Sequence, residues 1–182
     1  MKRIISQHQS ALEVLKNSGA TLQQITLICQ KALRNGNKII FFGNGGSAAD
    51  SQHLAAEFVG RFQKNREPLA ALALSVNSST LTAIGNDFGF QEVFSRQISC
   101  LAKPGDIAFG ISTSGNSPNV LNGFKAAKEG NVDTVAFLGK DGGKIANQVD
   151  IPLIVSVEQT PRIQEIHILA GHIICELIEA SL

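Results

Sequence analysis

The chain has 182 residues, of which 43% are hydrophobic and 17% are charged. This length and composition are typical of one globular domain with a substantial core. The formal net charge of +1 gives no electrostatic support for binding nucleic acid or an anionic membrane. We see neither a secretory leader pattern nor an apolar run near 18 residues, and we therefore expect a cytoplasmic protein.

The first 35 residues predict two helices. Apolar side chains recur at helical spacing between Ile4 and Leu15, as on the buried face of an amphipathic helix. Thr21 and Gln24 form a capping-box pattern for a second helix, which Gly36 ends. We therefore divide the chain into a helical segment, residues 1–36, and one domain over residues 37–182.

Strand and helix patterns alternate after residue 36. Largely apolar runs predict strands at residues 38–42, 69–75, 107–111, 134–138 and 151–155. Helical patterns cover residues 47–63, 79–85, 91–102, 118–129 and 161–180, with a short turn near Gly143. Continuous apolar strands are expected when helices cover both faces of a sheet. The sequence therefore predicts an α/β fold with a parallel, doubly wound sheet, whose ligands bind at the carboxyl ends of the strands.

A turn rich in hydroxyl groups follows the third predicted strand. Ser112, Thr113, Ser114 and Ser117 lie between this strand and the helix that Pro118 opens, with no Lys or Arg among them. Free backbone N–H groups at a helix start attract anions, and hydroxyl groups add neutral donors. This pattern favours a site for a small phosphorylated molecule, although Ser117 before Pro118 is also an ordinary helix cap.

Gly43, Asn44, Gly45, Gly46 and Ser47 form a second turn, directly after the first predicted strand. Glycines allow the backbone to approach a ligand closely. The third glycine of a dinucleotide fingerprint is absent, since Ala48 and Ala49 follow, which argues against a nicotinamide cofactor.

Two predicted helices carry further polar candidates. His53 and Glu57 are four residues apart on one helix face, a spacing that suits metal binding, acid–base chemistry or a simple surface hydrogen bond. On the last helix, Gln164 and His172 are eight residues apart, ~12 Å along the axis. His172 could also pair with Glu176.

Two other features are more readily explained by structure than by chemistry. Asn86 and Asp87 lie in a polar turn where Gly85 would stop a helix, and they could instead hold substrate hydroxyl groups. Cys29, Cys100 and Cys175 have no paired spacing and lie in apolar surroundings, and we expect buried free thiols.

Taken together, these motifs resemble the phosphoheptose isomerases of the sugar-isomerase (SIS) domain superfamily. The resemblance rests on the strings FFGNGGSAAD, QHLAAEFVGRF, IGNDFGF, GISTSGNSPNV, LGKDGG and RIQEIH, followed by His172. It implies a three-layer αβα sandwich with a five-stranded parallel sheet. It also implies a homotetramer with active sites at subunit boundaries, between which the N-terminal helices pack.

The resemblance also implies a role for each site residue. The phosphate would bind to Ser112, Thr113, Ser114 and Ser117, and the rest of the substrate to Gly45, Gly46, Ser47, Glu57, Asn86, Asp87 and Gln164. One zinc ion per subunit would be held by His53, Glu57, Gln164 and His172. Glu57 would act as the catalytic base and His172 as the acid.

The activity implied is isomerisation of sedoheptulose 7-phosphate to the aldose D-glycero-D-manno-heptose 7-phosphate through an enediol. This would be the first step of nucleotide-activated heptose biosynthesis for lipopolysaccharide or capsule. One alternative is a non-catalytic tetramer of the same fold that binds the replication initiator protein. Another is an isomerase for a different sugar phosphate.

Overall fold

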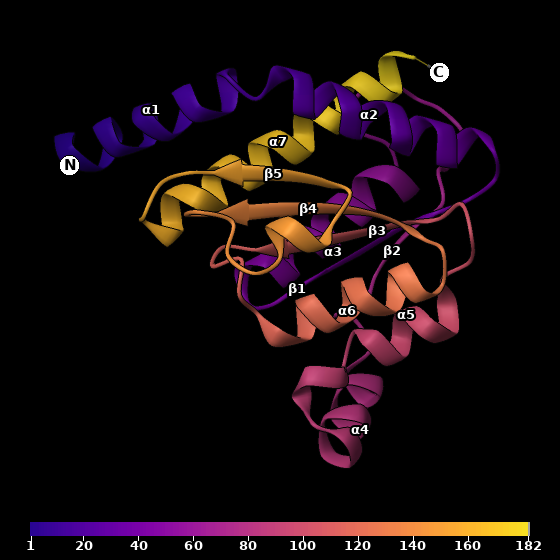
Figure 1. Cartoon of the computed structure of the whole chain (residues 1–182). Helices are drawn as coiled ribbons and strands as arrows, with labels where there is room; N and C mark the ends of the chain where they lie inside the picture. The colour runs from indigo at the N-terminus through magenta and orange to yellow at the C-terminus, as the bar shows by residue number, and fades with distance from the viewer. Residues whose placement is uncertain (182) are drawn as a thin grey trace.

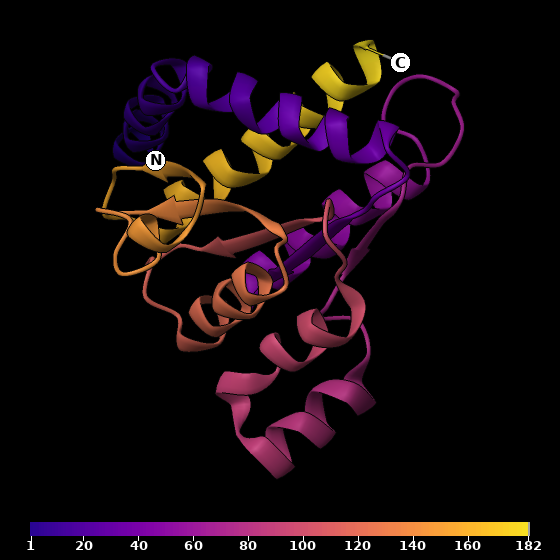
Figure 2. The ribbon, with the colours of Figure 1, turned by 45° about the vertical axis from the view of Figure 1, so that its right-hand side comes forward.

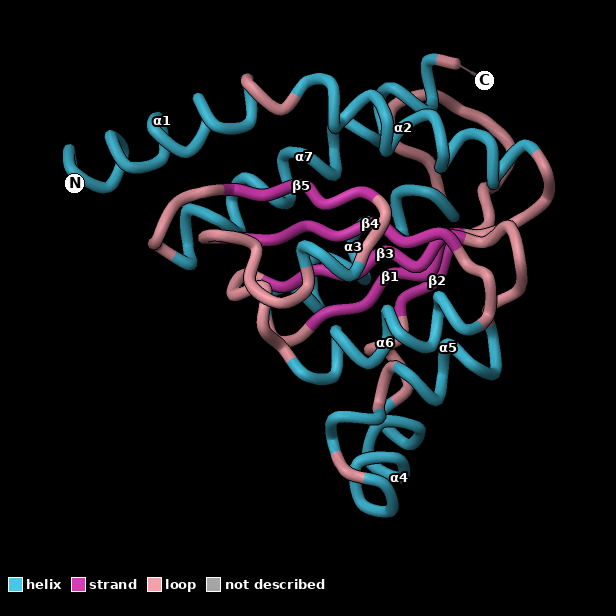
Figure 3. The backbone as a smooth tube through the Cα atoms, in the orientation of Figure 1, coloured by secondary structure: helices cyan, strands magenta, loops and turns pink. Residues whose placement is uncertain are grey.

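The computed structural model describes residues 1–181, which form one parallel sheet between two layers of helices (Figure 1). The strands are β1 (Ile39–Gly43), β2 (Ala71–Ala73), β3 (Ile107–Ser112), β4 (Asp133–Gly139) and β5 (Ile151–Val155). Their order in the sheet is β2-β1-β3-β4-β5, and every neighbouring pair is parallel (Figure 3). The predicted five-stranded, doubly wound fold is confirmed.

Helices follow the strands in the expected alternation. They are α1 (Lys2–Lys16), α2 (Gly19–Arg34), α3 (Gly46–Val59), α4 (Ser78–Phe88), α5 (Ser95–Leu101), α6 (Pro118–Glu129) and α7 (Thr160–Ala180). Two short 3-10 turns, η1 (Phe90–Glu92) and η2 (Ala146–Gln148), complete the elements of the described residues.

The sheet separates two hydrophobic cores, because successive side chains of a strand point to opposite faces. Ile39 and Phe41 of β1 pack into the core beneath α1, α2, α3 and α7. Ile40 and Phe42 pack into the core beneath α5 and α6. Both faces of the central strands are thus buried, which explains their continuous apolar sequence.

The helix α4 extends from this body. Figures 1 and 2 show it at the bottom of the molecule, where it packs beside η1. Phe88 at its end and Phe90 after it are 50% and 62% exposed. An apolar surface of this kind is typical of an interface.

Several predicted helix ends were wrong. The helix predicted to start at the Thr21 capping box starts at Gly19, and the helix predicted over residues 47–63 ends at Val59. The helix predicted over residues 79–85 continues to Phe88, because its stop is Gly89, at φ +90°, and not Gly85. Residues 91–102 form η1 and α5 in place of one helix.

Three other expectations had different outcomes. Cys29 and Cys175 are buried free thiols as expected, whereas Cys100 is exposed. The division at residue 36 stays a prediction, and α1 and α2 share a core with the sheet. Within residues 1–181, none of the helices combines the length and apolarity needed to cross a membrane.

His167 is the one histidine buried completely within the described chain. Its Nε2 lies 3.0 Å from the carbonyl oxygen of Leu138, and its ring lies 5.5 Å from that of Phe137. Burial lowers the pKa of His167 to about 4, against an opposing effect of the Leu138 hydrogen bond. Since the neutral ring donates to a carbonyl at the end of β4, it ties α7 to the sheet.

We therefore predict that acid destabilises the fold through His167. A lowered pKa means that the unfolded chain takes up the proton first, so stability is lost as the pH falls from 6.5 toward 4. The slope from this one group reaches about 1.4 kcal/mol per pH unit. Urea unfolding at pH 7 and pH 5 should show a smaller loss for His167→Gln than for the wild type, and equal losses would contradict the prediction.

Candidate functional site

The turn between β1 and α3 lies at the carboxyl end of β1 and presents its backbone there. Gly45 has φ +56°, a conformation that side chains with a Cβ rarely adopt, and it precedes the first residue of α3. Gly45 and Gly46 are exposed, whereas Ser47 is buried. The N–H groups of Ser47 and Ala48 donate to the carbonyls of Asn44 and Gly45, which leaves the exposed backbone of Gly45 and Gly46 accessible to an anion or to sugar hydroxyl groups.

The hydroxyl-rich turn lies beside it, because β1 and β3 are paired with Gly43 opposite Ile111. The Oγ of Ser112 lies 3.0 Å from that of Ser117 and 3.5 Å from that of Ser114. Three hydroxyl groups thus converge at the start of α6. Ser117 is the residue before the helix but makes no side-chain cap, so its hydroxyl is not committed to α6.

Two asparagines hold these turns together. Asn44 and Asn119 exchange two amide hydrogen bonds, each 2.8 Å long. The Oδ1 of Asn119 also accepts from the backbone N–H of Val120, 2.9 Å away. Neither residue was predicted to have a role, although Asn44 lies in one polar turn and Asn119 closely follows the other. A pocket of about 290 Å³ opens here, lined by Asn44, Phe90, Gln91, Ser117, Pro118 and Asn119.

Gln164 belongs to this end of the molecule. Its Nε2 lies so near Gly46 that a Cβ added to the glycine would overlap it. Together the two turns and Gln164 form what we call the turn cluster, defined by residues 44–47, residues 112–117 and Gln164. The structure therefore brings together Gly45, Gly46, Ser47, Ser112, Thr113, Ser114, Ser117 and Gln164 of the predicted substrate residues.

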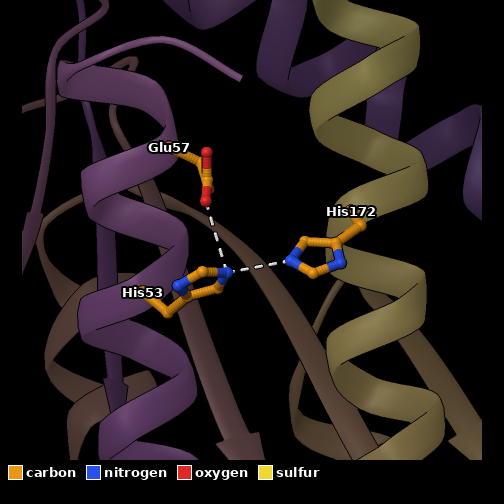
Figure 4. A group of neighbouring side chains, drawn as sticks. All are labelled: His53, Glu57 and His172. Atoms are coloured by element: carbon orange, nitrogen blue, oxygen red, sulfur yellow. Dashed lines mark hydrogen bonds and ion pairs between the residues drawn. The ribbon is translucent and has the colours of Figure 1, made fainter. Parts of the chain in front are cut away.

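A second group forms where α3 and α7 run side by side (Figure 4). The Nε2 atoms of His53 and His172 are 2.9 Å apart, and Nε2 of His53 is 3.3 Å from Oε1 of Glu57. One ligand atom from each of these residues lies within 4.8 Å of the others. We call His53, Glu57 and His172 the triad.

The triad has the composition of a metal site. Two imidazoles and one carboxylate are a common zinc ligand set that leaves a fourth position open. Two imidazole nitrogens that face each other at 2.9 Å also share one proton at most, so they suit a common cation between them. His172 meets His53 in the structure, whereas Glu176, its predicted alternative partner, is exposed.

Gln164 is not beside the triad. It contacts Gly46, and His53 is seven residues further along α3, roughly 10 Å at the rise of an α-helix. The structure thus places three of the four predicted zinc ligands together. Gln164 as a ligand stays a prediction.

Asp50 lies near His53, and no sequence pattern predicted a role for it. One of its carboxylate oxygens is buried without a hydrogen-bond partner among the described residues. Burial raises the pKa of Asp50, and the nearby His53 opposes this effect. Its position one turn before His53 on α3 was visible in the sequence, but its burial was not.

Asn86 and Asp87 lie elsewhere. They belong to the last turn of α4, where Asn86 Nδ2 donates to Asp87 Oδ1 over 2.7 Å. The turn predicted there is wrong, because both residues are helical. The helix α4 projects from the body (Figure 1), and among the described residues neither Asn86 nor Asp87 hydrogen-bonds to the turn cluster or the triad.

The fold and its polar groups point to one family of proteins. A family model described as the SIS domain matches residues 5–139, and the chain belongs to this family. It is 50% identical over 182 residues to the phosphoheptose isomerase of a Nitratiruptor species, covering 100% of the chain and 97% of that relative. It is 55% identical over 152 residues to the enzyme of that name from Aquifex aeolicus, covering 84% of the chain and 80% of the relative.

A solved structure agrees with these sequences. Phosphoheptose isomerase GmhA from Neisseria gonorrhoeae superposes with a TM-score of 0.91 and 43% identity, over 98% of each chain. Within the SIS domain family, the chain belongs to the phosphoheptose isomerases. It is therefore an aldose–ketose isomerase that acts on a sugar phosphate.

We predict that Asn119→Ala loosens the turn cluster. The change removes both hydrogen bonds to Asn44 and leaves the buried N–H of Val120 without its acceptor, which should cost about 1–3 kcal/mol of unfolding free energy. Urea unfolding measures this loss. The exposed Asn147→Ala is the matched control and should change stability by less than about 0.5 kcal/mol; equal effects would refute a linking role for Asn119.

Proposed function

We propose that the chain converts sedoheptulose 7-phosphate to the aldose D-glycero-D-manno-heptose 7-phosphate. The observation that supports this most is the triad, in which a carboxylate and two imidazoles from separate helices meet within 4.8 Å. Exchange of a carbonyl between C1 and C2 needs a base at carbon and an acid at oxygen. Glu57 and His172 supply these two functions.

The proposed isomerisation takes place in two proton-transfer steps. The Glu57 carboxylate removes a proton from C1 of the open-chain ketose while His172 gives a proton to the C2 oxygen, which yields an enediol. His172 then takes the proton of the C1 hydroxyl, and Glu57 returns its proton to C2. Since Oε1 of Glu57 faces His53, the other carboxylate oxygen is the one we assign to the substrate.

The turn cluster provides the complementary function of binding. Its three converging hydroxyl groups suit the phosphate oxygens of a monophosphate. A site without Lys or Arg binds a small anion more selectively than a polyanion, because it lacks the long-range attraction of a basic patch. We assign the phosphate to Ser112, Thr113, Ser114 and Ser117, and the adjoining sugar carbons to Gly45, Gly46, Ser47 and Gln164.

We further propose zinc as the cofactor. His53, Glu57 and His172 would hold it, His172 through the Nε2 that faces His53, which leaves Nδ1 of His172 for the proton transfer. Gln164 would complete the set only if its side chain leaves Gly46. A zinc ion at the triad would polarise a carbonyl and offset the negative charge of the enediol. The fit rests on the His₂Glu donor set and on the short distances within it.

A homotetramer with active sites at subunit boundaries is part of the same proposal. The turn cluster, the triad and the pair Asn86 and Asp87 lie in three places on one chain, and a boundary between copies can join them. Ile4 and Ile5 on α1 are about half exposed, as are Phe88 and Phe90 beside α4, which fits helices that pack between subunits. A cytoplasmic location and a role in heptose biosynthesis for a glycan complete the proposal.

The proposed function is tested by incubating the protein with sedoheptulose 7-phosphate and following the aldose. Glu57→Gln should lower kcat by about 10³-fold, since it removes the base, while circular dichroism shows an unchanged fold. The exposed Glu129→Gln is the control with normal activity. Turnover retained by Glu57→Gln would exclude Glu57 as the base, and no turnover by the wild type under any metal condition would exclude the function.

We predict that the metal and the triad are linked. A chelator should lower turnover and added zinc should restore it, because the developing charge of the enediol then has its counter-ion. His53→Ala should lower the zinc bound per subunit, measured by elemental analysis, with the fold retained. Zinc content unaffected by this change would place the metal elsewhere.

A further inference from the structure

The segment that follows α3 lies against the end of α7. Figure 2 shows this loop beside the last turns of α7, near the C-terminus of the chain. It covers residues 60–67, most of which are exposed. None of its residues takes part in the proposed proton transfers. The loop nevertheless joins the carboxyl ends of the two helices that carry the triad.

The loop is held by one buried carboxylate. Glu179 on α7 is 3% exposed. Its Oε1 accepts from the N–H of Phe62 at 2.9 Å and from Arg66 Nε at 3.0 Å. Its Oε2 accepts from the N–H groups of Gln63 and Lys64 at 2.8 and 2.9 Å. Four donors thus satisfy both oxygens, an arrangement that is costly to disrupt in a buried site.

The hydrogen bonds around Glu179 favour the ionised form of its carboxyl group. Burial raises the pKa of its carboxyl group, but the three backbone N–H groups and Arg66 outweigh this effect and lower the pKa to about 2. Since the folded pKa is below the usual value of 4.5, the stabilisation is complete above pH 4.5 and is lost as the pH falls toward 2. Glu179 is therefore ionised throughout the range in which an isomerase works.

Arg66 connects this carboxylate to the end of α3. Its two terminal nitrogens donate to the carbonyl oxygens of Glu57 at 2.8 Å and Phe58 at 2.9 Å. Because α3 ends at Val59, these carbonyls lie in its last turn and have no partner within the helix. Arg66 thus acts as a side-chain cap for the turn that bears the proposed base.

Phe62 connects the same loop to the proposed acid. Its ring centre lies 5.5 Å from that of His172, with an angle of 35° between the rings. The backbone N–H of Phe62 is one of the groups that Glu179 binds. One carboxylate therefore bonds both to Arg66, which caps the last turn of α3, and to the backbone of Phe62, whose ring packs against His172.

We propose that Glu179 is a positioning residue of the isomerase site, which it orders through Arg66 and through the backbone of Phe62, Gln63 and Lys64. We call this arrangement the clamp. Its effect falls on the triad and not on the turn cluster, so it acts on the chemical step more than on phosphate binding. The inference rests on the proposed function for its kinetic consequence and on the hydrogen bonds alone for its structural one.

The clamp is tested with Glu179→Gln, compared with the exposed loop variant Glu67→Gln as the matched control. Glu179→Gln should lower kcat about tenfold or more with KM changed less than about twofold, because small displacements of catalytic groups slow the chemical step. Hydrogen exchange of the amides of Phe62, Gln63 and Lys64 should accelerate at least about tenfold, because their acceptor is weakened. Glu67→Gln should leave kcat, KM and exchange as in the wild type.

Three further variants, at two positions, apply if Glu179→Gln does not fold. Arg66→Lys keeps the positive charge but cannot bond Glu179 and two carbonyls together, and it should also lower kcat at nearly constant KM. Phe62→Leu should do the same, whereas Phe62→Tyr, which retains the ring, should restore kcat.

The outcomes separate this inference from the proposed function. Folded Glu179→Gln with wild-type kcat, or wild-type exchange of the three amides, overturns the clamp. A lower melting temperature with normal kcat and KM also overturns it, since that is the result expected of a purely structural residue. Absence of isomerase activity in the wild type overturns the proposed function, while the exchange measurement still decides whether the clamp exists.

Discussion

Close packing of α3 against α7 holds the site together. Gly171 faces Leu54 so closely that a Cβ on the glycine would overlap the leucine side chain, and the residues next to them in the chain, His53 and His172, meet at 2.9 Å. Both helices lie on the same face of a parallel sheet and run in the same direction, so neighbouring pairs advance together along them, from Gly46 and Gln164 to His53 and His172. A bulkier residue at Gly171 would separate the imidazoles that make the triad.

The two halves of the site use different physical means. The turn cluster offers exposed backbone at Gly45 and Gly46 and converging hydroxyl groups before α6, which in the proposed function bind an anion without a formal positive charge. The triad relies on ionisable side chains of two packed helices, with His53 within α3, Glu57 in its last turn and His172 within α7. In the proposed function, this separation of binding from chemistry would let the phosphate anchor the substrate while the reacting carbons are positioned independently.

Local sequence patterns were reliable where one interaction dominated. Buried apolar runs predicted each strand to within a few residues, and Pro118 after Ser117 marked the start of α6 correctly. The predictions failed where two local signals competed. Gly85 looked like a helix stop, but Gly89 is the residue in the left-handed conformation, and α4 continues between them because glycine is tolerated inside a helix. Likewise, α3 ends at Val59, with Gly60 as its C-cap, and not near residue 63; Arg66, which bonds Glu179, binds the carbonyls of this last turn.

The order of residues was enough to specify the parallel sheet, the two polar turns at its edge and the shared face of His53 and Glu57, because each depends on neighbours within a few positions. Its motifs also indicated the family. The folded chain was needed to show that His172 joins His53 while Gln164 contacts Gly46, and that Asn44 pairs with Asn119. These contacts join residues 75 to 119 positions apart. They depend on helix packing and strand register, which no local pattern of residues encodes.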